Sequence, residues 1–153
     1  MLIPKKLIAM AISEAQKAFD SDEVPVGSVI SDFAGNIIAS AHNKTKSLND
    51  PTAHAEILAI RAACLKLKTN NLSQHIIYST LEPCCMCASA IVNAKINRLY
   101  FGLYDPKFGG ITNASILNQN NAYKKIEIYP EMIDEKAKNL LQTFFQNKRM
   151  KKN

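Results

Sequence analysis

Residues 80–91, TLEPCCMCASAI, place three of the chain's four cysteines within four positions, directly after a proline. Cys84 and Cys87 are three apart, so on a helix both sulfurs lie on one face and can bind the same metal ion. At the start of a helix, unpaired N–H groups and the helix dipole also favour thiolate over thiol. Cys85 points elsewhere, and we expect it to be a small buried hydrophobic residue. The spacing therefore favours metal binding by Cys84 and Cys87.

The preceding motif, TAHAEI, offers a further metal ligand. The sequence has no second Cys-x-x-Cys and no His-x-x-x-His, the patterns that complete structural zinc sites. His54 is the remaining candidate, and with the two cysteines it would leave one position for water, as in catalytic zinc sites. Glu56, two residues further on, is expected to remain off the metal. Taken alone, a histidine or glutamate near a helix start more often caps the helix or complements its dipole.

The combination of His-x-Glu with a later Pro-Cys-x-x-Cys is the signature of zinc-dependent nucleobase deaminases. Zinc lowers the pKa of a bound water toward neutrality and so supplies hydroxide. Replacing a ring amino group also requires a proton to move from that water to the ring nitrogen and on to the departing ammonia. A carboxylate beside the metal can carry this proton in both directions. We therefore expect Glu56 to be the catalytic carboxylate.

Length and composition favour a single domain over residues 1–153, because domains commonly contain about 100–150 residues. The hydrophobic content is 47% and the charged content 21%, which is typical of a folded domain. No segment has the length and apolarity of a membrane span or a secretory signal. We therefore expect a cytoplasmic protein, in which clustered cysteines are metal ligands before they are disulfides. The net charge of +6 favours polyanionic partners, although solvated lysines would give the same value.

Hydrophobic periodicity and turn residues predict alternating strands and helices. The second helix is expected to have Asp50 as its N-cap and Pro51 as its first residue, and the third to have Pro83 in its first turn. This order predicts an α/β domain with a mixed five-stranded sheet, mostly parallel beyond its first hairpin. The expected helices cover 7–19, 51–67, 83–94 and 135–150, and the strands lie in a hairpin over 26–41 and in 75–82, 98–104 and 125–129.

Four stretches, EVPVGSVI, DPTAHAEI, TLEPCCMCASAI and YDPKFGG, resemble the bacterial tRNA-specific adenosine deaminases of the cytidine deaminase-like superfamily. The resemblance is close over 23–110 and implies a three-layer α/β/α sandwich and a homodimer. It also implies a Zn²⁺ enzyme that binds the anticodon stem-loop of a tRNA and converts the wobble adenosine to inosine, releasing ammonia. It assigns zinc binding to His54, Cys84 and Cys87, proton transfer to Glu56, and contact with the flipped nucleotide to Asn43.

Asp105, in YDPKFGG, has two interpretations. It either caps the turn before Pro106, a common task for aspartate, or accepts a hydrogen bond from a ribose 2′-OH that DNA lacks. The resemblance favours the second, so we expect Asp105 to bind substrate. The chain also departs from the family pattern. Ser89 stands where glycine is usual, and ITNASI after Gly110 replaces the usual glycine-serine continuation.

The same residues leave other functions open. A deaminase of free guanine, cytosine or a nucleotide would have the same zinc site, and the basic C-terminal stretch favours RNA over such a small substrate. A solvated tail is the alternative explanation of that stretch. A thiol-disulfide oxidoreductase also presents Cys-x-x-Cys at a helix start, although His54 and Glu56 would then have no role. The basic stretch contains Lys148, Arg149, Lys151 and Lys152.

A zinc module that only binds nucleic acid is the remaining alternative, and it needs a fourth protein ligand. The candidates for this ligand are Cys64, Cys85, His42 and His75. Cys64 falls in an apolar helical stretch and is expected to lie in the core. His42 and His75 flank predicted strands and are expected to face solvent.

Overall fold

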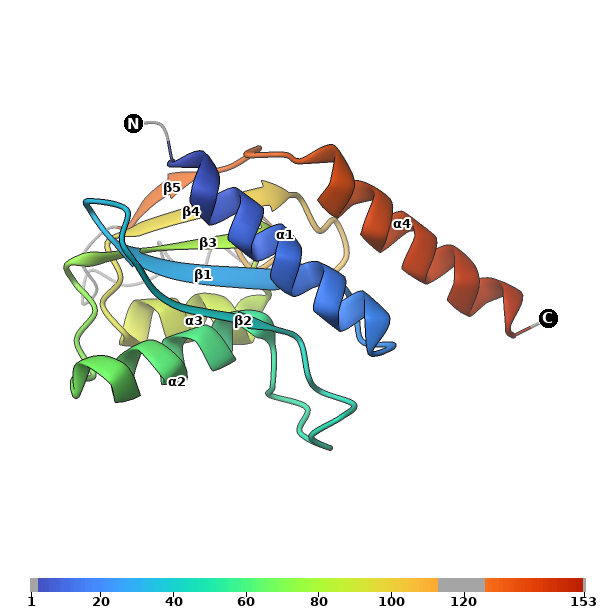
Figure 1. Ribbon diagram of the computed structural model, residues 1–153, viewed down its shortest axis with the longest axis horizontal. Helices are drawn as coiled ribbons and strands as arrows, with labels where there is room; N and C mark the ends of the chain where they lie inside the picture. Colours follow the sequence, from blue (N-terminus) through green and yellow to red (C-terminus); the bar gives the residue numbers. More distant parts are fainter. Residues whose placement is uncertain (1–2, 113–125, 153) are drawn as a thin grey trace.

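The computed structural model describes residues 3–112 and 126–152 and forms three layers (Figure 1). A five-stranded sheet in the order β2-β1-β3-β4-β5 separates two pairs of helices, α1 with α4 on one face and α2 with α3 on the other. The predicted three-layer α/β/α architecture is therefore confirmed. The helices are α1 (Lys5–Asp20), α2 (Ala55–Leu67), α3 (Cys85–Asn93) and α4 (Glu135–Met150). The strands are β1 (Gly27–Asp32), β2 (Ile37–His42), β3 (His75–Leu81), β4 (Arg98–Leu103) and β5 (Glu127–Tyr129).

Strand pairing confirms the mixed sheet. β1 pairs antiparallel with β2 and β3, whereas β3 with β4 and β4 with β5 are parallel. The β1–β2 hairpin turns where the sequence predicts it, because the Asp32 carboxylate accepts hydrogen bonds from the backbone N and side-chain Nδ2 of Asn36. Gly35 occupies the turn with a φ of 84°, a backbone conformation that disfavours larger residues.

The central strand β3 has two different faces because side chains alternate along a strand. Ile76 and Tyr78 pack in the cluster beneath α1, with Leu7 and Ala11 of that helix. Ile77 packs in the larger cluster on the α2 and α3 side of the sheet. Ser79, fully buried, shares this second side and bonds to a residue of α2. The side of β3 that faces α2 and α3 therefore carries both part of the larger core cluster and the residue that contacts the candidate site.

Two helices begin later than the sequence predicts. α2 begins at Ala55, because the Asp50 carboxylate accepts hydrogen bonds from Thr52 N and Oγ1 and closes a turn instead of capping the helix. α3 begins at Cys85, so Pro83 precedes the helix and is not in its first turn. A proline restricts the residue before it to extended conformations. Such a residue is as common in a segment that leads into a helix as at the helix start itself, so the prolines alone do not locate the first helical residue.

None of the helices in the described ranges has the length and apolarity needed to span a membrane. The predicted loop NQNNAY, and the part of ITNASI that follows Thr112, lie outside the described residues.

Candidate active site

The N-termini of α2 and α3 meet at the carboxyl end of β3, and the residue before each helix is a candidate ligand. His54 is the N-cap of α2 and Cys84 the N-cap of α3, both with extended backbone. Neither side chain makes a capping hydrogen bond to its own helix. The carboxyl ends of strands are where ligands usually bind in α/β proteins. The backbone thus directs both side chains to one place and leaves them available for a ligand.

The spacing of three donor atoms fits a tetrahedral zinc ion. His54 Nδ1 lies 3.6 Å from Cys84 Sγ and 3.5 Å from Cys87 Sγ, and all three atoms lie within 4.8 Å of one another. Zinc bonds of about 2.3 Å to sulfur and 2.0 Å to nitrogen, at tetrahedral angles, place N and S about 3.6 Å apart. Within the described ranges these residues form the only such cluster. Cys85 is exposed and outside it, so its predicted burial is wrong.

The cluster favours a thiolate at Cys84 and a thiol at Cys87. A hydrogen bond from Cys87 lowers the pKa of Cys84 to about 4. The same bond raises the pKa of Cys87, and the hydrogen bond to Cys84 raises the pKa of His54. The protons in the cluster are therefore shared among the three groups that a cation would bind. Metal binding would displace them, because cysteine and histidine bind metals in their deprotonated forms.

Glu56 lies beside this cluster and is almost fully buried, with 4% of its surface exposed. Ser79 Oγ donates a hydrogen bond of 3.1 Å to Glu56 Oε1, and Glu56 Oε2 lies 3.5 Å from Cys87 Sγ. Burial raises the pKa of the Glu56 carboxyl, so it can hold a proton closer to neutral pH than an exposed glutamate. Ser79 belongs to no motif, so its contact with Glu56 could not be predicted from local patterns.

Asn43 provides a buried polar atom without a protein partner. The residue is 6% exposed, and its Oδ1 accepts no hydrogen bond within the part of the chain that the structure describes. Leaving a buried acceptor unpaired costs about 1–3 kcal/mol, so such an atom is typical of a site that binds a ligand. The next residue, Lys44, donates its backbone N–H to Ala53 O, directly before His54. Asn43 is therefore fastened next to the segment that carries the candidate ligand.

Asp105 caps a turn in the loop that follows β4. Its Oδ1 accepts hydrogen bonds of 3.0 Å from both Lys107 N and Phe108 N. The loop lies against the start of α3, where Gly109 pairs with Cys84 in an isolated β-bridge. The structural interpretation of Asp105 is thus observed, and its contact with a ribose 2′-OH stays a prediction.

Three buried carboxylates were not predicted, because isolated acidic residues usually lie at the surface. Glu23 accepts hydrogen bonds from Lys46 N and Ser47 N in the loop that follows Asn43. Glu82, directly before Pro83, accepts hydrogen bonds from the loop that follows β4. The third, Glu14 in α1, contacts β2 and is described below with His42. Glu23 and Glu82 each fix a loop for which the sequence predicts no constraint.

The spare ligand candidates are used elsewhere. His42 Nδ1 lies 2.7 Å from Glu14 Oε2, and its side chain is mostly buried, so the expectation that it faces solvent is wrong. His75 is partly exposed, as expected, although its Nδ1 is buried. Cys64 is partly buried and packs against the main core. None of them joins the His54 cluster, so no fourth protein ligand is found among the described residues.

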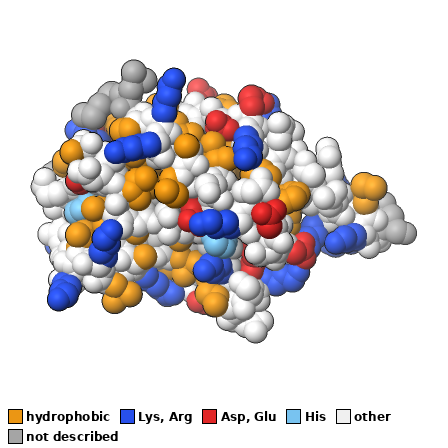
Figure 2. Space-filling model, in the orientation of Figure 1, with side chains coloured by type: hydrophobic (Ala, Val, Ile, Leu, Met, Phe, Trp, Pro, Cys, Tyr) orange, Lys and Arg blue, Asp and Glu red, His pale blue; other side chains and the backbone are white. Residues whose placement is uncertain are grey.

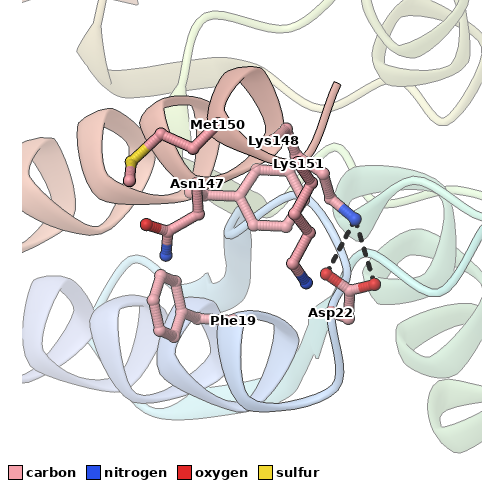
Figure 3. Close-up of a pocket in the computed structure, with 7 residues that line it drawn as sticks. Phe19, Asp22, Asn147, Lys148, Met150 and Lys151 are labelled. Carbon is pink, nitrogen blue, oxygen red and sulfur yellow. Dashed lines mark hydrogen bonds and ion pairs between the residues drawn. The ribbon is translucent and has the colours of Figure 1, made fainter. Parts of the chain in front are cut away.

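The basic end of α4 is only partly free to bind other molecules. Lys and Arg side chains are scattered over the visible face among hydrophobic and other side chains (Figure 2). Lys148 Nζ lies 2.8 Å from Asp22 Oδ1 across a groove between the ends of α1 and α4 (Figure 3). Lys46 contacts the same carboxylate, and the hydrogen bonds from Lys148 and Lys46 lower the pKa of Asp22. The exposed cations of this end are Arg149, Lys151 and Lys152.

The chain is similar to known deaminases. It matches the MafB19-like deaminase family over residues 4–149. It is 43% identical to the tRNA-specific adenosine deaminase of Aquifex aeolicus, an alignment that covers 93% of each chain. Identity to the Agrobacterium fabrum protein of the same name is 41%, covering 92% of this chain and 93% of that one. A solved structure from a study of A-to-I editing by tRNA:A34 deaminases at the wobble position superposes with a TM-score of 0.84. That match has 38% identity and covers 90% of this chain and 100% of the other.

Proposed function

The chain belongs to the MafB19-like deaminase family, and from that premise we propose that it is a tRNA-specific adenosine deaminase. It would convert the wobble adenosine of a tRNA anticodon loop to inosine by hydrolysis, releasing ammonia. The observation that carries this proposal is the His54, Cys84 and Cys87 cluster with the buried Glu56 carboxylate beside it. Residues 1–153 would form one deaminase domain, acting in the cytoplasm, where tRNA is found.

We propose that the ion held by His54, Cys84 and Cys87 is Zn²⁺, because sulfur and imidazole ligands at tetrahedral spacing suit zinc. When bound, zinc lowers the pKa of water and provides a nucleophile at neutral pH. Cys84 is the N-cap of α3 and Cys87 lies in its first turn, where the helix dipole favours bound anions, including thiolates that have lost their protons to a metal ion.

Glu56 would carry the proton. It would accept a proton from the attacking water and deliver it to N1 of adenine, then take the second proton from the oxygen now bound to C6 and pass it to the departing amine. A C6–O bond thereby forms while the C6–N6 bond breaks, and ammonia leaves. Ser79 Oγ fixes one carboxylate oxygen and leaves the other, Oε2, on the side of the metal-ligand cluster. A general acid and base must lie within hydrogen-bonding reach of the groups that it serves, which this orientation allows.

Asn43 and Asp105 are the proposed substrate-binding residues. The unpaired Oδ1 of Asn43 can accept a hydrogen bond from the flipped nucleotide. Asp105 can accept one from a ribose 2′-OH, and its turn-capping bonds would then hold it in place for that contact. If so, Asp105→Asn should narrow the difference in activity between an RNA loop and the same loop made of DNA.

A homodimer is also proposed, from the composition of α2. Its sheet-facing positions are buried, yet Ile57, Leu58 and Leu65 lie on the remaining surface, with Leu65 79% exposed. Apolar side chains that remain accessible along one helix are typical of a surface that contacts a partner. A second copy of the chain, packed through the same helix, would cover this surface in a symmetric contact. Light scattering of the purified protein should give twice the chain mass, and Leu58→Arg should give the mass of one chain.

The exposed cations of α4 should contribute to RNA binding through phosphate contacts. Removing Arg149, Lys151 and Lys152 together by glutamine substitution should flatten the dependence of log Kd on log salt, by about 0.7 for each lost contact with single-stranded RNA. Lys148→Gln is the matched control, because Lys148 is already paired with Asp22. It should leave the slope nearly unchanged. An unchanged slope in the triple variant would mean that these residues are only solvated.

The proposed function is tested directly with purified protein. An anticodon stem-loop with wobble adenosine should be converted to inosine, while free adenosine, cytidine and guanine should be deaminated far more slowly. Activity on guanine or cytosine instead would support a free-base deaminase. No activity on any of them would remove the proposal.

A further inference from the structure

The loop after β4 is fastened to the metal-binding end of α3 by one buried carboxylate, that of Glu82. Glu82 is 2% exposed and lies two residues before Cys84. Its Oε2 accepts a hydrogen bond of 2.9 Å from Asp105 N. Its Oε1 accepts bonds from Ile111 N at 3.1 Å and from Thr112 N and Oγ1, both at 2.8 Å. Both ends of the loop are therefore tied to one side chain.

The loop also lies too close to α3 to have side chains at its two glycines. Gly110 N donates a hydrogen bond of 2.8 Å to Pro83 O. A Cβ on Gly110 would lie 2.6 Å from Cys85 N, and one on Gly109 would occupy the space of the Glu82 carboxylate. Contacts this short require the backbone to move. The backbone of the loop thus lies in direct contact with the Glu82 side chain and with the start of α3.

The outer side of the same loop carries groups suited to RNA. Phe108 is 62% exposed, and Lys107 Nζ lies 5.1 Å from the centre of its ring. An exposed aromatic ring stacks on unpaired bases, and a neighbouring cation pairs with phosphate.

We infer that Glu82 is a positioning residue for the RNA substrate, holding the loop 105–112 at a fixed place relative to Cys84. This inference rests on the proposed function, because the loop would present Phe108 and Lys107 to the anticodon loop while the target base enters the site. Glu82 itself touches neither the donor cluster nor the substrate. Its effect is transmitted through the hydrogen bonds of Asp105, Ile111 and Thr112.

The substitution Glu82→Gln separates this role from simple packing. Glutamine has nearly the same volume, and its oxygen can keep the bonds from Ile111 and Thr112. Its NH₂ group then faces Asp105 N–H, so two donors meet and the Asp105 end of the loop is released. We expect the KM for the anticodon stem-loop to rise about tenfold with kcat nearly unchanged, because initial placement of the substrate is affected while the reacting groups remain in position.

Two readouts do not depend on activity. Metal content per chain should be unchanged in Glu82→Gln, and amide hydrogen exchange should accelerate at Asp105, with a smaller change at Ile111 and Thr112, whose bonds to the side-chain oxygen are kept. Glu14→Gln is the matched control, since Glu14 is 5% exposed and accepts hydrogen bonds from His42 and Ser40 on the other face of the sheet. It should lower the melting temperature without changing the KM or exchange in the loop. If Glu82→Gln does not fold, Gly109→Ala, which displaces the same carboxylate, provides the measurements.

The outcomes distinguish this inference from the proposed function. Faster exchange in the loop with a raised KM and retained metal supports it. Loss of metal, or a lower melting temperature with unchanged KM and loop exchange, overturns it. If the wild-type protein deaminates no RNA, the proposed function is wrong. Hydrogen exchange in the loop 105–112 would even then show whether Glu82 holds that loop in place.

Discussion

Replacing Glu56 by glutamine should lower kcat on the anticodon stem-loop at least about 10²-fold, the usual minimum cost of removing a general acid and base. Glutamine keeps the size of the side chain and can still accept the hydrogen bond from Ser79, so the site should retain its shape. It cannot carry a proton between water, ring nitrogen and amine. Single-turnover kinetics with excess enzyme would measure the chemical step without product release.

The controls for Glu56→Gln are metal content and RNA affinity, both of which should match those of the wild type. Glu56 lies 3.5 Å from Cys87 Sγ but is absent from the cluster of donor atoms. If Glu56→Gln released the metal, Glu56 would be a ligand and its proposed role would be wrong. If the variant kept full activity, another group would have to move the proton.

Removing a ligand should abolish activity by a different route. His54→Ala and Cys84→Ser should each reduce the bound metal from about one zinc per chain to a small fraction, because catalytic zinc is usually held by three protein ligands. Elemental analysis and release of zinc to a chromogenic chelator would measure this loss. Deamination should fall with the metal.

Cys85→Ser is the matched control for the ligand variants. Cys85 is adjacent to Cys84 in sequence, of the same type, and exposed outside the cluster. It should keep both metal and activity. Wild-type protein free of zinc, or a fully active Cys84→Ser variant, would disprove the assignment.

Much of the fold follows from local sequence patterns. Apolar spacing predicts the first helix over 7–19, and α1 covers Lys5–Asp20. The hairpin of β1 and β2 followed from its turn residues. The candidate ligands could be predicted because binding one metal ion requires a particular spacing of the cysteines. His54, Cys84 and Cys87 lie together as predicted.

The rest of the site depends on contacts between distant residues, which a single sequence does not encode in local patterns. Ser79 meets Glu56 across 23 positions, and Glu82 meets Thr112 across 30. The start of α2 was misplaced because Asp50 and Pro51 match the usual pattern of a helix start, whereas the chain uses them for a turn. His54 becomes the N-cap instead, which positions its ring toward the cysteines.

The two-sided β3 also limits how this protein can change over evolutionary time. A single inserted or deleted residue within β3 would exchange the faces of every residue beyond it. Ser79 would then turn away from Glu56, and the bulky ring of Tyr78 would enter the catalytic side while the core under α1 lost it. Stability and activity would fail together. The turn between β1 and β2 joins no functional groups, so length variation among descendants of this chain should accumulate there and be absent from β3.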